Sequence, residues 1–399
     1  MPFFMHMDLL SEFIRVNYVV ENWSFYPSFN RLVIFYVESF FYQITQWFVV
    51  NPDILLHLSD PKFSTASTTQ HFIFVGDPHV YRHIFLFKLP YLVFDLLCAR
   101  LIWCYFVGHQ RQVMATTLWL FNPVTIYSTY IFGRFEVISL FFLLWTAVSL
   151  KNHRWLIASV MLGLAINSRE INLIFIPAFF IALISQWRLD NISNIECVSC
   201  GLVICFSVMF PYIIESIFSL EPLFTKEANV LEISGGLSSF FESKYSFLYL
   251  FFFLTAISYF SLIDNKVLSP DQLFVMASIC IILPFFIDNF RSAHYFSWAI
   301  PFLVLACMHT QRLVFPIFCL FAFWVLYWML NPAGAHFTPL LATPIHESLF
   351  GLGNLLSAWQ NEFSTHAILN ANTLKDLFMT LTAACMSVIL IRVNQKSAT

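Results

Sequence analysis

The sequence predicts an all-α protein, a polytopic transmembrane helical bundle of about 10–12 spans. Hydrophobic residues make up 59% of the chain and charged residues only 11%, and the mean hydropathy is +0.74. Apolar stretches follow one another along the chain, and the charges lie mostly between them. A soluble domain could not hide this much apolar surface, because most of a protein's surface contacts water.

Each expected span is a mostly apolar stretch, and a spanning helix needs about 20 such residues. The candidates are 31–50, 84–107, 113–131, 135–150, 155–167 joined to 171–186, 196–215, 245–263, 271–288, 294–309, 313–330 and 374–392. The arms of the 155–186 hairpin are short, so one of them is a candidate re-entrant segment. Residues 1–30 form an N-terminal segment of uncertain role, 31–392 the multi-span domain, and 393–399 a cytoplasmic tail.

The basic residues predict the orientation of the bundle. Short loops rich in Lys and Arg are expected on the cytoplasmic side. They carry Arg111, Lys151, Arg154, Arg188, Lys266, Arg312, Arg392 and Lys396. Alternation of the spans then places the long segments 51–83, 217–244 and 331–373 on the outer side.

Charged residues gather at the outer ends of several expected spans. The groups are Asp77–His83, followed by Lys88 inside a span, then Gly133–Glu136, Asn167–Glu170 and Asp288–Tyr295. Each group alone has a structural alternative, an ion pair or a headgroup anchor, and Lys88 has the alternative of extending its ammonium to the interface. Together, several cations at one depth suit a phosphate or pyrophosphate, which Arg binds through two parallel hydrogen bonds.

These groups supply the candidate site residues. We expect phosphate or donor binding by Arg82, His83, Lys88, Arg134, Arg291 and His294, with pocket support from Glu136, Arg169 and Glu170. Pairing is expected between Arg134 and Glu136 and between Arg169 and Glu170. The net charge of −3 argues against a nucleic-acid partner, and no residue set is expected to hold a metal ion.

Four short motifs resemble those of the bacterial GT-C type integral-membrane glycosyltransferases. They are Lys88 to Asp95 (KLPYLVFD), Leu118 to Thr125 (LWLFNPVT), Gly133 to Glu136 (GRFE) and His294 to Phe302 (HYFSWAIPF). The family has a K-x-P-x-x-x-x-D span, an N-P helix, a G-Q-x-D turn and a late helix in which His leads an aromatic run. The resemblance covers roughly residues 77 to 305 and implies a GT-C-like arrangement of the spans.

The resemblance implies transfer of a hexose such as mannose from a polyprenyl-phosphate sugar to a glycan, lipid or protein acceptor on the extracytoplasmic face. Membrane lipid is then a further partner, and a divalent cation is an optional cofactor. The location implied is the bacterial inner (plasma) membrane, with the endoplasmic reticulum membrane as the alternative. The chain departs from the family by having Arg134 and Glu136 in place of Gln and Asp, and by having no clear span within 1–30.

The catalytic acid is expected to be Asp77 or Asp53, acting as general base on the acceptor hydroxyl. Asp60 is a further candidate if 31–50 is the family's first span. If that span is missing, Glu21 or Asp8 takes this place. Two other functions stay open, namely a lipid-linked sugar transporter or flippase and a non-catalytic membrane subunit of a glycosylation complex.

Overall fold

The protein is all-α in the part of the chain that the structure, a computed structural model, describes. The described residues are helices joined by turns, with no strand among them. They are residues 9, 12, 13, 16, 20, 32–48, 77–219, 268–288, 293–309, 313–330, 377, 378 and 380–389. The expected span 245–263 lies outside this part, as do most of 1–30 and most of the three long outer segments.

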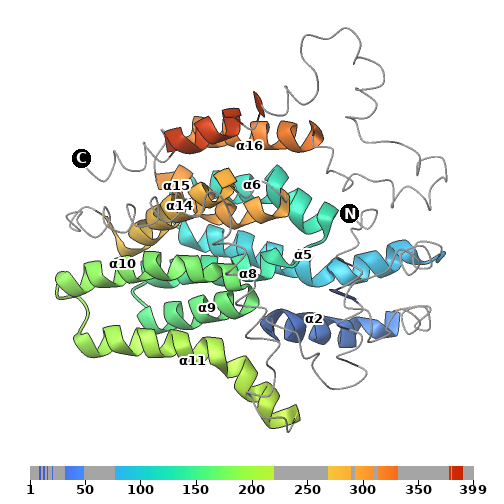
Figure 1. Cartoon of the computed structure of the whole chain (residues 1–399), viewed down its shortest axis with the longest axis horizontal. Coiled ribbons are helices and arrows are strands. Elements are labelled where there is room, and N and C mark those ends of the chain that lie inside the picture. The colour runs from blue at the N-terminus through green and yellow to red at the C-terminus, as the bar shows by residue number, and fades with distance from the viewer. Residues whose placement is uncertain are drawn as a thin grey trace.

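The first half of the described chain runs from α2 to α9, and its helices follow the apolar stretches closely (Figure 1). The elements are α2 (Leu32–Thr45), η1 (Gln46–Phe48), α5 (Val80–Tyr105), α6 (Gln112–Leu120), α7 (Pro123–Ile126), η2 (Tyr127–Phe132), α8 (Glu136–Lys151) and α9 (Trp155–Ser168).

The Asn122-Pro123 pair interrupts the stretch 113–131, as expected for a proline inside an apolar run. The Asn122 side chain accepts hydrogen bonds from the backbone N–H groups of Val124 and Thr125, at 2.9 and 3.3 Å. Asn122 is therefore the N-cap of α7, and Pro123 occupies the first helical position, where its missing N–H costs nothing. The stretch is folded as α6, α7 and the π-helical turn η2 instead of one straight helix.

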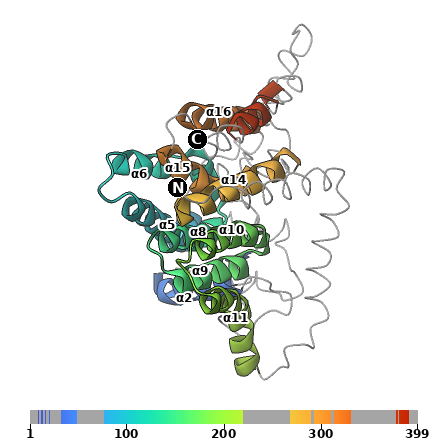
Figure 2. The same cartoon turned by 90° about the vertical axis from the view of Figure 1, so that its left-hand side faces the viewer.

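The second half begins at the turn after α9. Its elements are η3 (Glu170–Phe175), α10 (Ile176–Arg188), α11 (Asn194–Ser219), α14 (Pro270–Asp288), η4 (Ala293–Ala299), α15 (Ile300–His309) and α16 (Val314–Leu330). Two views show the helices stacked side by side in the order α11, α9, α8, α14, α15 and α16 (Figures 1 and 2).

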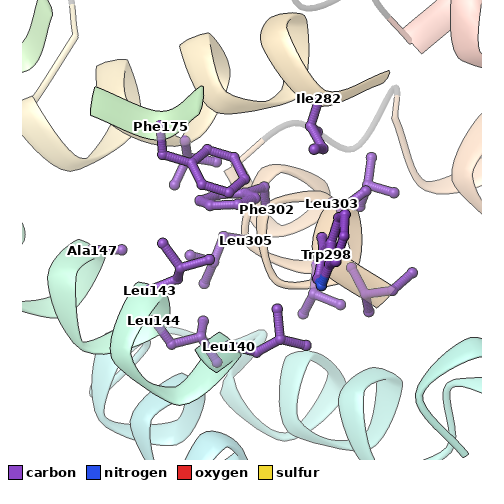
Figure 3. Close-up of a cluster of buried hydrophobic side chains, with 14 of the residues drawn as sticks. Leu140, Leu143, Leu144, Ala147, Phe175, Ile282, Trp298, Phe302, Leu303 and Leu305 are labelled. Carbon is purple, nitrogen blue, oxygen red and sulfur yellow. The ribbon is translucent and has the colours of Figure 1, made fainter. Parts of the chain in front are cut away.

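The core lies where α8 meets η3, α14 and α15 (Figure 3). Leu140, Leu143 and Leu144 of α8 face Phe302 of α15, and the rings of Phe302 and Phe175 are 4.8 Å apart. All five side chains are buried. Helix α8 is thus covered by protein on several sides, since it also packs against α5 and α9.

Two described helices are long and apolar enough to cross a membrane, judged by length and composition. They are Ile171–Arg188 and Asn194–Pro211, and the second has only 22% of its residues buried. Shorter apolar helices cover Trp155–Ser168, Pro270–Leu283, Tyr295–Cys307, Val314–Tyr327 and Thr380–Ile389. The expectation of about 10–12 spans therefore stays a prediction.

Candidate functional site

Lys88 lies inside the protein on α5. Its side chain is buried, and Nζ donates a hydrogen bond of 2.6 Å to the backbone carbonyl of Tyr130. Tyr130 belongs to η2, and π-helical turns occur frequently at functional sites. Extension of the Lys88 ammonium to the interface, the alternative left open by the sequence, does not occur.

Gly133 ends η2 and brings Lys88 close to the following turn. Its φ of +77° is in the left-handed region that glycine adopts without strain. A Cβ on Gly133 would lie 3.2 Å from Cε of Lys88 and 3.2 Å from Cδ2 of Leu9. The small residue therefore permits the lysine stem to pack against the backbone directly before Arg134.

Glu136 joins two arginines from separate turns. Its Oε1 lies 3.0 Å from Nη2 of Arg169 and 3.6 Å from Nε of Arg134. The relative exposures of Glu136, Arg169 and Arg134 are 0%, 4% and 8%, so the ion pairs are shielded from water. The expected pairing of Arg134 with Glu136 is confirmed, and Arg169 reaches across to the same carboxylate.

Aromatic rings flank both guanidinium groups. The Cζ atoms of Arg134 and Arg169 each lie 5.1 Å from the ring centroid of Phe135. Arg169 also lies 5.9 Å from the Tyr295 ring and 5.6 Å from the Trp298 ring. These distances are within cation–π range. Tyr295 and Trp298 belong to the predicted late motif, so η4 approaches the turn that carries Arg169.

We call Lys88, Arg134, Glu136 and Arg169 the buried charge cluster. Its members come from α5, from the turn before α8 with the first residue of α8, and from the turn after α9. The set holds three basic side chains and one acidic one. Buried groups of this kind are costly unless they are paired or serve a ligand.

The other expected residues near the start of α5 lie outside this cluster. Arg82 is exposed on the first turn of α5, about 9 Å along the helix axis from Lys88. His83 is buried beside it. Asp77 is buried before the helix, and its Oδ1 accepts a hydrogen bond of 2.5 Å from the backbone N–H of His79.

Four further candidates are described incompletely or not at all. Asp53 and Arg291 lie outside the described residues. Glu170 begins η3 and His294 lies in η4, and only their backbone is described. Their predicted roles stay predictions.

A small cavity with a mostly apolar lining and two carboxylates lies beside α5, and it was not predicted from the sequence. Glu12 and Glu38 line it together with Tyr91, and its volume is about 30 Å³, roughly enough for two water molecules. The Tyr91 hydroxyl donates a hydrogen bond of 2.7 Å to Oε1 of Glu38. Tyr91 follows Lys88 by about one turn of α5, so the two residues share a helix face.

A sequence signal for this cavity does exist. Glu38 is the one acidic residue in the apolar stretch 31–50. An ionisable residue inside an expected span is by itself a reason to expect a functional site. Among the described residues, no three His, Cys, Asp or Glu side chains gather in a way that could hold a metal ion.

Comparison of this chain with protein-family models, with curated proteins and with solved structures finds no match. The resemblance to the GT-C glycosyltransferases therefore rests on the motif residues themselves, of which Lys88, Arg134 and Glu136 lie in the buried charge cluster.

Proposed function

We propose that the chain is a multi-span membrane glycosyltransferase that moves a sugar from a polyprenyl-phosphate donor to an acceptor on the extracytoplasmic face. The observation that carries the proposal is the buried charge cluster. Two arginines from separate turns pair with the Glu136 carboxylate. The Lys88 ammonium binds the backbone of η2, and its stem packs against Gly133, directly before Arg134. Such an arrangement suits a phosphate group at membrane depth, because preorganised cations stabilise the negative charge left on the departing lipid phosphate.

The directions of the helices support the extracytoplasmic location. Helix α8 begins at Glu136 and ends at Lys151, and α9 begins after Arg154 and ends just before Arg169. Arg188 ends α10. The cluster and the short basic loops thus lie at opposite ends of these helices. The positive-inside rule predicts that the basic loops are cytoplasmic, and this supports an outer location for the cluster.

The surface of α11 supports a membrane environment. Large apolar side chains at near-helical spacing are exposed along it, among them Ile195, Val198, Leu202 and Phe206. Lipid acyl chains cover such a face without the free-energy cost that water would impose.

In the proposed reaction, the acceptor hydroxyl attacks the anomeric carbon of the donor sugar, and the bond from that carbon to the phosphate oxygen breaks. The lipid phosphate leaves with the bonding electrons, and a carboxylate takes the hydroxyl proton. Asp77 and Asp53 are the predicted acceptors of that proton. Glu38 is a third candidate, because it lines a cavity together with Tyr91, which is about one helical turn after Lys88. We expect inversion at the anomeric carbon, with a divalent cation optional.

The proposal is tested by transfer from labelled undecaprenyl-phosphate mannose or glucose, using purified protein in lipid nanodiscs. We expect Arg169→Ala to lower turnover by about 10²–10³-fold, as removal of one transition-state donor does in other enzymes. Arg169→Lys keeps the charge but loses the planar guanidinium, so its turnover should lie between that of Arg169→Ala and that of the unmodified protein. Arg154→Ala is the matched control, because Arg154 is exposed at the opposite helix end.

Unchanged turnover in Arg169→Ala, with normal expression and melting, contradicts the phosphate role of the cluster. Movement of the intact lipid-linked sugar across the membrane, without sugar transfer, would show that the protein is a flippase and not a glycosyltransferase. Transfer activity that requires a co-purified subunit would favour the alternative function, in which this chain is a non-catalytic subunit of a glycosylation complex.

A further inference from the structure

Tyr130 is hydrogen-bonded at both of its ends to α5. Its backbone carbonyl accepts the 2.6 Å bond from Nζ of Lys88, and its hydroxyl donates a bond of 2.6 Å to Oδ2 of Asp95. Lys88 and Asp95 are about two helical turns apart and so lie on one face of α5. One residue of η2 thus bridges two polar residues of the same helix.

Asp95 is itself held in place from a third element. Its Oδ1 accepts a hydrogen bond of 2.8 Å from Nε1 of Trp119, on α6. Both side chains are buried. The two carboxylate oxygens therefore receive donors from α6 and η2. Hydrogen bonds to charged acceptors are among the stronger ones in proteins, so this carboxylate fixes η2 against α5.

The position of η2 matters for the cluster because the chain passes directly from Tyr130 to Arg134. The backbone N–H of Arg134 donates a hydrogen bond of 3.1 Å to the carbonyl of Ser128, also in η2. Gly133, which lies between Tyr130 and Arg134 in the chain, packs against the Lys88 side chain. A shift of Tyr130 would move the acceptor of the Lys88 ammonium and the turn that carries Arg134 together.

We propose that Asp95 and Tyr130 are positioning residues, which set the spacing between the Lys88 ammonium and the Arg134 guanidinium in the site for the lipid phosphate. This inference rests on the proposed function. Neither residue needs to touch the substrate. A lysine side chain has several rotatable bonds, and a carbonyl anchored through the same residue to Asp95 limits its ammonium to one place.

The matched control is a second buried pair of the same chemistry. The Tyr105 hydroxyl donates to Oδ2 of Asp271, and both side chains are buried. Tyr105 lies at the far end of α5 from Lys88. Tyr105→Phe and Tyr130→Phe each remove one hydrogen bond from a Tyr hydroxyl to a buried carboxylate. Of the two residues, only Tyr130 also binds a member of the buried charge cluster, Lys88.

The experiment measures binding of undecaprenyl phosphate to the full chain in nanodiscs, with undecaprenol as the uncharged control ligand. We expect Tyr130→Phe to weaken phosphate-dependent binding by about tenfold, the size of one hydrogen bond, and Tyr105→Phe to leave it within about twofold. Asp95→Asn should bind more tightly than Asp95→Ala, because an amide can still bond both neighbours.

Equal binding by Tyr130→Phe and the unmodified chain, with Lys88→Ala weakened, overturns the positioning role and leaves the proposed function standing. Equal weakening by Tyr130→Phe and Tyr105→Phe also overturns it, since both would then act through stability alone. If Lys88→Ala and Arg169→Ala bind undecaprenyl phosphate normally, the proposed function fails and this inference fails with it.

Discussion

Helices α8 and α11 are both strongly apolar, but they occupy opposite environments. Nearly every residue of α8 is buried, and α8 packs against α5, α9 and α14. Helix α11 exposes Leu202 and Phe206 on one face, and its other face packs on α9. Apolarity therefore does not separate the interior of this protein from its surface.

Polar and small residues mark the interior instead. On α8, Glu136 and Ser139 are buried, and Ser139 accepts a 2.5 Å hydrogen bond from the side chain of Asn172. Helix α11 meets α9 through small residues, with Ser207 against Gly163. Polar groups inside and apolar groups outside are typical of helices in lipid, where close packing and hydrogen bonds hold neighbours together.

Removal of the Glu136 carboxylate should have the largest effect on stability. Glu136→Ala leaves two buried guanidinium groups without their shared acid, and loss of one partner from a buried ion pair costs about 3–5 kcal/mol. Glu136→Gln keeps the shape and some hydrogen bonding, so it should cost less. The measurement is thermal unfolding of the protein purified in detergent. Melting of Glu136→Ala at the unmodified temperature would show that the cluster does not stabilise α8.

The α9–α11 contact should tolerate added volume poorly. A Cβ at position 163 would lie 2.4 Å from Cβ of Ser207, and neither atom can rotate away. We expect Gly163→Ala to cost about 1–3 kcal/mol, the usual range for overpacking. Ser207→Gly should recover part of the loss in the double variant, which a double-mutant cycle measures.

Gly201→Ala is the control for that substitution on the partner helix. Its Cβ would meet only Cζ of Phe180, at 3.9 Å. The change should be neutral or stabilising by up to about 1 kcal/mol, because alanine favours helix over glycine. A loss as large as that of Gly163→Ala would mean that the close contact with Ser207 is not what sets the cost at position 163.

Much of this arrangement follows from the sequence, because apolar runs mark helices and breakers mark their ends. The stretch 135–150 matches α8, and the Asn122-Pro123 pair, a helix breaker inside an apolar run, marks the end of α6 and the start of α7. The pairing of Arg134 with Glu136 was also predicted, since the two residues share one turn.

Pairing across helices could not be predicted in the same way. The sequence pointed to Glu170 as the partner of Arg169, because the two are adjacent. The Glu170 side chain is not among those that the structure describes, so that pairing stays a prediction. The structure shows Arg169 on Glu136, in a contact that depends on how α8 and α9 pack. Likewise, the hydrogen bond between Tyr91 and Glu38 joins α5 to α2, and no local pattern specifies which helices are neighbours.

The smallest effect is expected on the exposed face of α11, and it gives the most direct test of the comparison. Leu202→Ala removes the same atoms as Leu143→Ala on α8, but Leu202 is 65% exposed and Leu143 is 0% exposed. The first should change the free energy of unfolding in detergent by about 0.5 kcal/mol or less. The second should cost about 2–5 kcal/mol, because it leaves a cavity in the core shown in Figure 3.

Equal losses at the two leucines would contradict the assignment of this face to lipid, since they would require protein against Leu202. Reconstitution sharpens the result further. Detergent and lipid chains are both apolar, so transfer of Leu202→Ala from detergent into a bilayer should leave its small effect small. A face covered by a second protein would instead lose stability on detergent extraction in the unmodified chain, before any residue is changed.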